Sequence, residues 1–417
     1  MKSDCDYSGL RVTILGVARQ GAALARFMLR CGAVVALSDQ RPAEALAPAV
    51  RALEDFAREA GAPPPTLAAG GHPIELLDKT DLLLLSGGVS PAIPIAQEAR
   101  RRGIQVSNDG ALTLRHCPAP VIGITGSAGK TTTTTLTGLI FEAGGFRVHV
   151  GGNIGTPLID RLDQIMPGDK VVMELSSFQL ELMDGSPAIA GLLNITPNHL
   201  DRHPSMSHYA AAKANILRFQ GRGDTAVLNA DDAYTGAWLA SGRVRVDAGE
   251  GQEALYFPLQ ASLHSFSLVH EVAVGAFMQG ERLVLRREGQ PDAHLCDSAD
   301  MRLRGRHNRA NMLAAVALAS AAGAGPAEMA AVATTFTGVE HRLEIVRQRN
   351  GVLWINDSIA TAPERTVAAI TSFDEPLVLL LGGRDKHLPW DECAAQVHRS
   401  RVRKVILFGE AAGLIAE

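Results

Sequence analysis

The stretch that decides the fold is VIGITGSAGKTTTTT, residues 121–135. It opens with an apolar run that predicts a buried strand, and the residues after Thr131 have the apolar spacing of a helix. Between them lies G-x-x-x-x-G-K-T from Gly123, a phosphate-binding loop in its expected strand–turn–helix context. In such a loop, backbone N–H groups surround phosphate oxygens, the lysine (Lys130) reaches the β- and γ-phosphates, and the Thr131 hydroxyl binds Mg²⁺. A chance glycine-rich turn is disfavoured, because both the motif and its context match.

Length and composition indicate a globular protein of several domains. At 417 residues, the chain is expected to hold two or three domains of about 150 residues each. The net charge of −4 gives none of the basic surface of a nucleic-acid-binding protein. Apolar runs stay shorter than the ~20 residues of a membrane-spanning helix, and the polar N-terminus lacks a secretory segment. We therefore expect a cytoplasmic protein without a nucleic-acid or membrane partner. The chain is also expected to be a monomer.

The cysteines indicate the same compartment. The chain has five, at positions 5, 31, 117, 296 and 393, and they form no C-x-x-C pair. Scattered cysteines in odd number suit a reducing cytoplasm, and they argue against both a disulfide framework and a zinc site.

A second glycine-rich turn occurs near the N-terminus, in RVTILGVARQG, residues 11–21. A strand, the pattern Gly16-x-Ala18-x-x-Gly21 and a helix follow one another, and the next strand ends at Asp39, where a Rossmann fold places its ribose-binding acid. This order predicts a nucleotide-like βαβ unit. NAD is disfavoured, because Ala18 replaces the middle glycine and a better nucleotide site follows at Lys130. A merely structural strand–helix corner is an open alternative.

Further strands are expected at residues 81–86 and 103–106. Between them the turn-rich GGVSPAIP occupies the place where open α/β sheets bind ligands. HCPAP, residues 116–120, breaks the periodicity and predicts a linker.

Polar residues follow several apolar strands after the phosphate loop. Glu174 ends VVME, and an acid at the end of a strand parallel to the phosphate-loop strand is in the position of a metal ligand. The apolar residues before it indicate burial, and a buried carboxylate needs a partner such as Mg²⁺. His199 follows the next apolar strand at the same edge. From the residues alone, Asn153 is favoured as a plain turn residue and Lys213 as part of a solvated helix face.

The remaining chain continues the alternation of elements. Short alternating runs in residues 243–304 predict antiparallel strands. A helix is expected to begin near His307, with Asn308 and Asn311 on its first turn and able to face a ligand. Strands ending in INDS and LLLGG then predict a third α/β unit with an unfinished end. The expected fold class is α/β.

Taken together, these stretches resemble the Mur ligases, the ATP-dependent amino-acid-adding enzymes of peptidoglycan assembly. ELSSFQLE with GGNIG is specific for the branch that adds glutamate to UDP-N-acetylmuramoyl-L-alanine. The resemblance implies a Rossmann-like uridine-binding domain at residues 1–118, a central ATP-binding domain with an antiparallel sheet at 119–338, and a short Rossmann-like amino-acid-binding domain at 339–417. The runs that carry the resemblance follow the family's order to about residue 409: GITGSAGKTT, GGNIG, ELSSFQLE, NITPNHLDRH, YAAAK, LNADD, HNRAN, FTGVEHRLE, INDS and LLLGGRDK.

The resemblance also implies the functional residues. The catalytic residues would be Lys130, Glu174, His199 and Lys213. Two Mg²⁺ ions would bind, one at Thr131 and Glu174 and one at His199 and a CO₂-derived carbamate on Lys213. The other ATP-binding residues would be Gly126, Ser127, Ala128, Gly129, Thr132, Asn308, Asn311, Arg342 and Asp357. The UDP-muramoyl substrate would contact Asn153, Ser176, Gln179, His199 and Lys386, with Gly16, Arg19, Gln20, Asp39, Gln40, Arg41 and Gly88 around the uridine part, and His341 would lie in the same cleft.

The reaction implied by the resemblance proceeds through an acyl phosphate. The substrate's L-alanine carboxylate attacks the γ-phosphate of ATP, and the amine of glutamate, expected to be the D-isomer, then attacks the acyl phosphate. Because acyl phosphates hydrolyse readily, the domains are expected to close and exclude water.

Two departures from the family pattern concern the amino acid. Ile359 stands where the family has a lysine thought to hold glutamate, and isoleucine cannot pair with a carboxylate. The family's C-terminal Ser-Pro and Asp-x-Phe elements are missing, so that either the chain is truncated or its glutamate site is incomplete. L-glutamate or another amino acid is therefore an alternative substrate. A non-catalytic binder of nucleotide or UDP-sugar-peptide is an alternative of another class.

Overall fold

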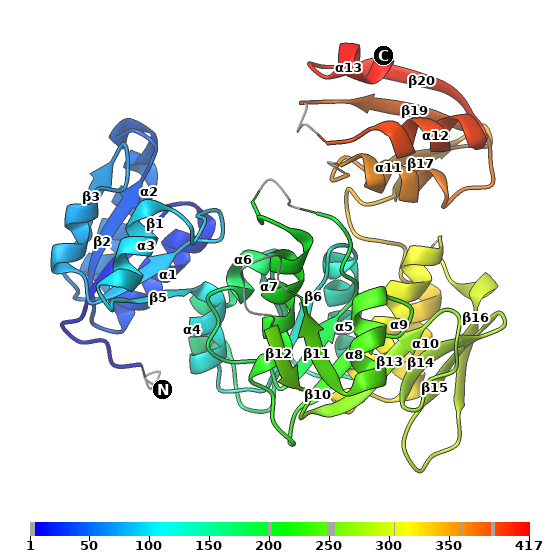
Figure 1. Cartoon of the computed structure of the whole chain (residues 1–417), viewed down its shortest axis with the longest axis horizontal. Helices are drawn as coiled ribbons and strands as arrows, with labels where there is room; N and C mark the ends of the chain where they lie inside the picture. The colour runs from blue at the N-terminus through cyan, green and yellow to red at the C-terminus, as the bar shows by residue number, and fades with distance from the viewer. Residues whose placement is uncertain (1–4, 199–201, 248–254, 304, 361, 385–387) are drawn as a thin grey trace.

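The computed structural model describes residues 5–198, 202–247, 255–303, 305–360, 362–384 and 388–417. Strands and helices alternate along these residues and form sheets in three successive regions of the chain (Figure 1). The predicted α/β fold class is confirmed.

The N-terminal region contains a parallel sheet in the order β3-β2-β1-β4-β5. Alternate residues of β1 and β4 belong to two apolar cores, one under each face, which is why these strands are nearly continuous apolar runs. The strand order reverses between β1 and β4, so their carboxyl ends flank the crevice in which open α/β sheets bind ligands. The elements are β1 (Arg11–Leu15), α1 (Arg19–Arg30), β2 (Val34–Asp39), α2 (Ala43–Glu59), β3 (Thr66–Ala69), β4 (Leu82–Leu85), α3 (Pro94–Arg101), β5 (Gln105–Asn108) and α4 (Asp109–His116).

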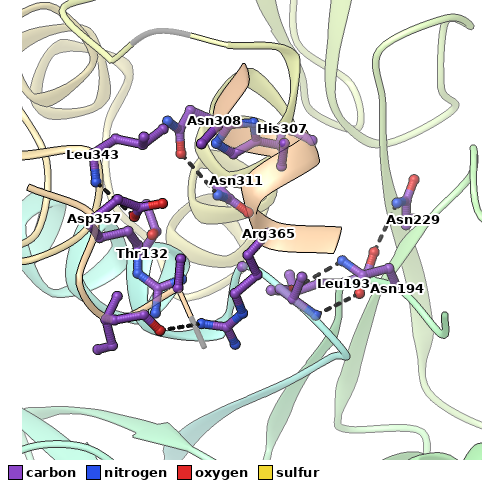
Figure 2. Close-up of a pocket in the computed structure, with 18 of the residues that line it drawn as sticks. Thr132, Leu193, Asn194, Asn229, His307, Asn308, Asn311, Leu343, Asp357 and Arg365 are labelled. Atoms are coloured by element: carbon purple, nitrogen blue, oxygen red, sulfur yellow. Dashed lines mark hydrogen bonds between the residues drawn. The ribbon is translucent and has the colours of Figure 1, made fainter. Parts of the chain in front are cut away.

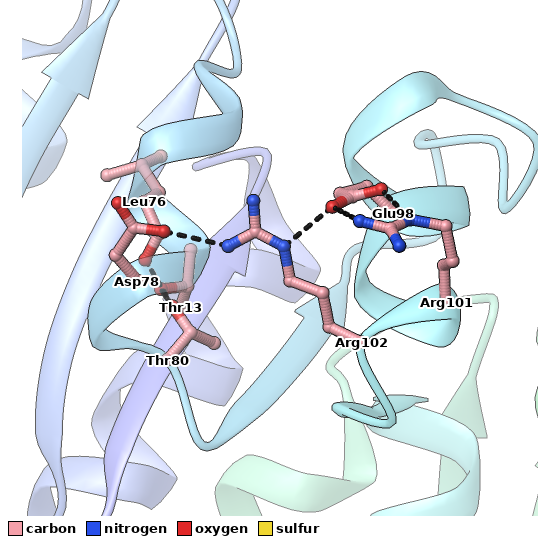
Figure 3. Close-up of polar contacts among 7 residues, drawn as sticks. All are labelled: Thr13, Leu76, Asp78, Thr80, Glu98, Arg101 and Arg102. Atoms are coloured by element: carbon pink, nitrogen blue, oxygen red, sulfur yellow. Dashed lines mark hydrogen bonds and ion pairs between the residues drawn. The ribbon is translucent and has the colours of Figure 1, made fainter.

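Charged side chains fasten α3 to the edge of this region (Figure 3). The Arg102 guanidinium donates to Glu98 and to Asp78, each at 2.7 Å, and so joins α3 to the short helical turn at Ile74–Lys79. Arg101 also donates to Glu98, and the two arginines lower the pKa of that carboxyl to about 2. These contacts are exposed, so they fix geometry more than they add stability.

The central region is built on a mixed sheet in the order β16-β15-β14-β13-β10-β9-β6-β8-β7. From β7 to β14 neighbouring strands are parallel, and β15 and β16 are antiparallel additions at one end. The phosphate-loop strand β6 therefore lies between β8 and β9. The strands are β6 (Val121–Thr125), β7 (Val148–Gly152), β8 (Lys170–Glu174), β9 (Ile189–Leu192), β10 (Thr225–Asn229), β13 (Ser262–Ser267), β14 (Gly275–Gln279), β15 (Arg282–Arg286) and β16 (Ala293–Asp297).

Helices cover this sheet on its two faces. Ile122, Ile124 and Val172 pack with α5 (Lys130–Ala143), α9 (Arg306–Ala321) and α10 (Pro326–Thr335) in one core. The alternate residues Val171 and Met173 pack with α7 (Met206–Arg218) in the other. The period-2 alternation of strand side chains thus places α5 and α7 on opposite faces of β6.

The prediction of antiparallel strands across residues 243–304 is only partly right. β11 (Arg243–Val246) and β12 (Leu255–Pro258) are antiparallel, as are β14, β15 and β16. β13, however, pairs in parallel with both β10 and β14. Alternating side chains do not encode strand direction; the long connection through α8 (Ala233–Ser241), β11 and β12 returns the chain for a parallel pairing beside β10.

The C-terminal region has smaller sheets with exposed apolar side chains. β17 (Glu344–Arg349) pairs antiparallel with β18 (Val352–Asn356), and β19 (Leu377–Gly382) pairs in parallel with β20 (Val402–Phe408). Val378, Leu380 and Phe408 are each more than half exposed. The helices here are α11 (Pro363–Ile370), α12 (Asp391–Arg399) and α13 (Ala412–Ala416).

A disulfide between Cys5 and Cys31 joins the N-terminal segment to the end of α1. The cysteine pattern argued against a disulfide framework, and for this pair the prediction is wrong. The chain folds back so that Tyr7 N–H donates to the Cys31 carbonyl, which brings two sequence-distant thiols together. Among the described residues, no helix combines the length and the hydropathy that crossing a bilayer requires.

Candidate functional site

The phosphate-loop sequence forms the predicted strand, turn and helix. β6 ends at Thr125, and α5 begins at Lys130 after Gly129, whose φ is +85°. A Cβ on Gly129 would lie 2.2 Å from Asn311 Oδ1, so both conformation and space require glycine there. Asn194, two residues after the end of β9, fixes the loop, because its side-chain amide accepts from the N–H of Ala128 and donates to the carbonyl of Ala128.

The Lys130 ammonium turns back onto its own loop. Its Nζ donates to the carbonyls of Gly126 at 2.9 Å and Ser127 at 3.3 Å. Burial lowers the pKa of Lys130 to about 8; the Glu174 carboxylate opposes this shift, and the guanidiniums of Arg365 and Arg342 add to it. A cation held in this way can exchange carbonyl oxygens for those of a phosphate.

Glu174 lies where a metal ligand was predicted. It ends β8, which is parallel to β6, and it is buried. One carboxylate oxygen accepts from the Thr131 hydroxyl at 2.9 Å, and the other accepts from the Asn153 amide at 3.0 Å. Carboxylate and hydroxyl oxygens at the start of a phosphate-binding helix are the donor set that suits Mg²⁺.

Lys213 is buried on the inner side of α7, so its assignment to a solvated helix face is wrong. The amine donates to Gly126 O at 2.8 Å, the carbonyl that Lys130 also uses, and lies 4.6 Å from the centre of the Tyr209 ring. Burial lowers the pKa of Lys213 well below its ordinary value, and the Lys130 charge acts in the same direction. The run YAAAKA has no contrast between apolar and polar faces, and so gave no signal of this burial.

A pocket extends from the phosphate loop to the C-terminal region (Figure 2). Two of the residues that line it, Thr132 and Arg342, each have a buried side-chain atom, Oγ1 and Nε, without a hydrogen-bond partner in the described structure. Orphaned polar groups beside a phosphate loop fit an oxygen-rich ligand such as a nucleotide. The polar residues that line the pocket are Thr132, Asn194, Asn229, His307, Asn308, Asn311, Arg342, Asp357 and Arg365.

The pocket brings together predicted and unpredicted residues. Four residues that were predicted for the ATP site line it: Asn308, Asn311, Arg342 and Asp357. Asn311 donates to Asn308 at 3.2 Å, and Asp357 accepts from the Leu343 N–H. The sequence analysis missed His307, Asn194, Asn229 and Arg365. Asn194 and Asn229 could have been found, because Asn229 ends β10 and Asn194 lies two residues past β9, at the edge already chosen for Glu174. Arg365, in contrast, comes from α11 in a separate sheet region.

The predicted uridine-site residues gather at the carboxyl ends of β1, β2 and β4. Asp39 accepts from Val17 N–H at 2.7 Å and from Arg41 at 2.8 Å, and Arg41 holds the pKa of that carboxyl well below its usual range. Gln40 and Gly88 are exposed nearby. The Arg19 guanidinium reaches the carbonyl of Asn153 at 3.3 Å, which links the N-terminal turn to the Glu174 cluster.

A buried polar network continues this link. Gln20 accepts from Gly87 N–H at 3.0 Å and donates to Asp109, while the Gln179 amide donates to both Asp109 oxygens at 3.1 Å. Burial raises the pKa of Asp109, a residue that the sequence analysis did not single out, to about 6. Ser176 and Gln179 also form the capping box of the short helix α6 (Ser177–Leu180).

Three predicted site residues remain: His199, His341 and Lys386. His199 and Lys386 lie outside the described residues. His341 is exposed beside Asn356, with its Nδ1 2.7 Å from that amide.

Comparisons with known proteins agree with this geometry. The Mur ligase middle domain matches residues 124–319, and the Mur ligase glutamate ligase domain matches residues 341–417. The UDP-N-acetylmuramoylalanine–D-glutamate ligase of Symbiobacterium thermophilum is 42% identical over 98% of this chain and 84% of its own length. The enzyme of that name from Pelotomaculum thermopropionicum is 38% identical over 99% of this chain and 85% of its own length.

Solved structures share the fold at low sequence identity. UDP-N-acetylmuramate–alanine ligase MurC from Thermotoga maritima matches with a TM-score of 0.56 and 18% identity, covering 98% of this chain and 87% of its own. MurF ligase from the same organism, in complex with ADP, matches with a TM-score of 0.53 and 16% identity, covering 98% and 87%. Relatives that are 38% and 42% identical over nearly the whole chain establish common descent. The chain therefore belongs to the Mur ligase family, in the branch of the UDP-N-acetylmuramoylalanine–D-glutamate ligases.

Proposed function

We propose that this protein joins D-glutamate to the L-alanine carboxylate of UDP-N-acetylmuramoyl-L-alanine, with ATP as the phosphoryl donor. The observation that carries the proposal is the convergence of Lys130, Thr131, Glu174 and Lys213 on one turn of backbone. Two amines, a hydroxyl and a carboxylate placed there suit the activation of a carboxylate by a triphosphate. The names of the relatives supply the substrates.

ATP would lie along the pocket with its phosphates at the loop. Lys130 would leave its carbonyl partners for the β- and γ-phosphates, and Arg342 would gain a partner for its buried Nε. Asn308, Asn311 and Asp357 would line the nucleoside side. The Thr131 hydroxyl and the Glu174 carboxylate would hold Mg²⁺, which neutralises phosphate charge when it is bound.

In the first step, a carboxylate oxygen of the L-alanine unit attacks the γ-phosphorus, and the bond to the ADP oxygen breaks. In the second, the glutamate nitrogen attacks the acyl carbon of the acyl phosphate, inorganic phosphate leaves, and the nitrogen loses its proton. Lys130 and the loop N–H groups stabilise the negative charge that develops at the phosphoryl group. Closure of the C-terminal region over the pocket would keep water from the acyl phosphate.

Lys213 would carry a carbamate. Its lowered pKa favours the neutral amine, whose lone pair can add to the carbon of CO₂ with loss of one proton. The product is a carboxylate beside the Lys130 ammonium, and the two groups attract each other. With His199, this carboxylate would hold a second Mg²⁺.

The muramoyl substrate would extend from the loop to the N-terminal crevice. For contacts with the muramoyl part we propose Asn153, Ser176, Gln179, His199 and Lys386. For the uridine part we propose Gly16, Arg19, Gln20, Asp39, Gln40, Arg41 and Gly88.

We also propose that the chain is divided into three domains, at residues 1–118, 119–338 and 339–417.

An amino-acid screen tests the proposal. Purified protein with UDP-N-acetylmuramoyl-L-alanine, ATP and Mg²⁺ should release phosphate when D-glutamate is added, and mass spectrometry should show the product heavier by one glutamyl residue. Release only with L-glutamate or another amino acid would favour the alternative that Ile359 suggests, since this apolar side chain lines the pocket. Ligand binding with no product for any amino acid would contradict the ligase.

A further inference from the structure

We propose that Glu181, His203 and His208 form a binding site for a transition-metal ion, Zn²⁺ by their chemistry, separate from the Mg²⁺ site at Glu174. Glu181 directly follows α6, His203 precedes α7, and His208 lies in the first turn of α7. In the described part of the chain, this is the group of histidine, cysteine and carboxylate side chains that meets the spacing a metal ion needs.

The three ligand atoms have the spacing of one face of a coordination tetrahedron. His203 Nδ1 lies 3.1 Å from Glu181 Oε1 and 3.2 Å from His208 Nδ1, and His208 Nδ1 lies 3.8 Å from the same Glu181 oxygen. Metal–ligand bonds of 2.0–2.1 Å in a tetrahedral site give ligand–ligand edges of about 3.3–3.4 Å. Only a few tenths of an ångström of adjustment would therefore accommodate the ion.

The donors also distinguish the kind of metal. Two imidazole nitrogens and one carboxylate oxygen are a His₂Glu set, which zinc binds readily and which Mg²⁺, a cation that prefers oxygen ligands, does not. A proton on one Nδ1 can serve only one of the three close approaches among these atoms. A cation between them would satisfy all three at once.

The surroundings of His203 hold its ring as metal-bound histidines are held. Its other nitrogen, Nε2, lies 2.9 Å from the Ser177 hydroxyl, an outer-shell contact that fixes tautomer and orientation. The ring stacks on Phe178 at 5.2 Å with an interplanar angle of 5° and packs against Tyr209, and its side chain is fully buried. His208 is 44% exposed, which leaves an open side for water as a fourth ligand.

The site would join the helix that carries Lys213 to the end of β8. Tyr209 contacts the His203 ring on one side and the Lys213 amine on the other. A metal that joins α6 to the first turn of α7 would therefore stabilise the position of α7, and with it that of Lys213 beside the phosphate loop. The cysteine count argued against zinc, but none of these ligands is a cysteine, so that argument does not reach them.

Metal titration of the full-length protein tests the site. After chelation and dialysis, the protein is kept in excess Mg²⁺ with ADP to occupy the oxygen-donor site, and Zn²⁺ or Co²⁺ is added. We expect one equivalent to bind by calorimetry, with a visible Co²⁺ spectrum of low coordination number. The double variant Glu181→Gln/His208→Asn should weaken binding at least about 100-fold.

Two controls separate the site from incidental binding. His294→Asn removes another exposed histidine that lies beside a carboxylate, Asp297, and should leave metal affinity unchanged. Thermal melting without metal shows whether the double variant folds, and added Zn²⁺ should raise the melting temperature of the wild type but not that of the double variant. Equal metal affinity in wild type and a folded double variant, or no binding by the wild type, would overturn the proposal.

Discussion

Two strand–glycine–helix corners in this chain have similar sequences but different charged side chains around the turn. At the N-terminal corner, residues 16–21, the Asp39 carboxylate accepts from the Val17 N–H and is paired with the Arg41 guanidinium. At the second corner, residues 123–131, the Lys130 and Lys213 amines gather around one carbonyl. A glycine turn before a helix therefore does not by itself make an anion site. The side chains that surround the turn decide which ligand groups it can bind.

The largest effect should come from removing the cation of the second corner. We expect Lys130→Ala to lower the rate of amino-acid-dependent phosphate release by at least about 10³-fold, because the developing phosphoryl charge loses its partner. The melting temperature should change little, since the hydrogen bonds of this amine in the described structure go to its own loop. Lys79→Ala, at an exposed lysine, is the control. Activity within tenfold of the wild type would remove the distinction between the corners.

The next effect tests the metal ligand at the same corner. Glu174→Gln keeps shape and can still accept from Thr131, but it lacks the charge that draws Mg²⁺. We expect turnover to fall by roughly 10²-fold and the Mg²⁺ concentration at half-maximal rate to rise. Titration of Mg²⁺ in the phosphate-release assay measures both. Glu142→Gln, at an exposed position, should leave both unchanged.

At the N-terminal corner the effect that the packing predicts is a loss of stability. A Cβ on Gly21 would lie 1.8 Å from the Gly16 carbonyl oxygen, so Gly21→Ala must displace α1 from β1. We expect a loss of roughly 2–4 kcal/mol in the free energy of unfolding of this region. Hydrogen exchange of β1 and α1 measures it, with Gly168→Ala in open space as the control. Unchanged protection of β1 would show that the close packing is not needed.

The smallest effect concerns Asp109, which joins Gln20 of the first corner to Gln179. Its pKa of about 6 in the folded protein lies above the ordinary 3.8, so the folded state binds the proton more tightly. Its stabilisation is complete below about pH 4 and is lost as pH rises through 6. Relative to Asp109→Asn, the wild type should lose on the order of 1–3 kcal/mol of unfolding free energy between pH 4 and 7.

Denaturant unfolding of the two proteins across this pH range is the measurement. Asp55→Asn changes an exposed carboxylate and should follow the wild-type profile. Parallel profiles for wild type and Asp109→Asn would mean that the buried carboxyl keeps an ordinary pKa.

The parts predicted from sequence are those set by local patterns. The loop at Gly123 and the strand ending in Glu174 follow from residues next to one another, and the structure has both. The burial of Lys213, the disulfide at Cys5 and the place of Arg365 depend on how distant segments meet. Spacing along one chain contains no information about such meetings.

The direction of strand pairing and the domain limits could likewise not be predicted from local sequence patterns. The alternation in β13 is the same for a parallel and an antiparallel partner, and only the long connection from β10 decides between them. The family resemblance raised Lys213 and Asn153 from ordinary helix and turn residues to candidate site residues. The roles and domain limits that it implies are proposals for the experiments above.

The Gly126 carbonyl, which accepts from both Lys130 and Lys213, has a consequence for the order of events. One oxygen divided between two amines holds neither as firmly as it would hold one. When a triphosphate draws the Lys130 amine away from the Gly126 carbonyl, the Lys213 amine becomes the remaining donor of this pair. Nucleotide binding would then be coupled to Lys213 on α7, the helix on the opposite face of the sheet from α5.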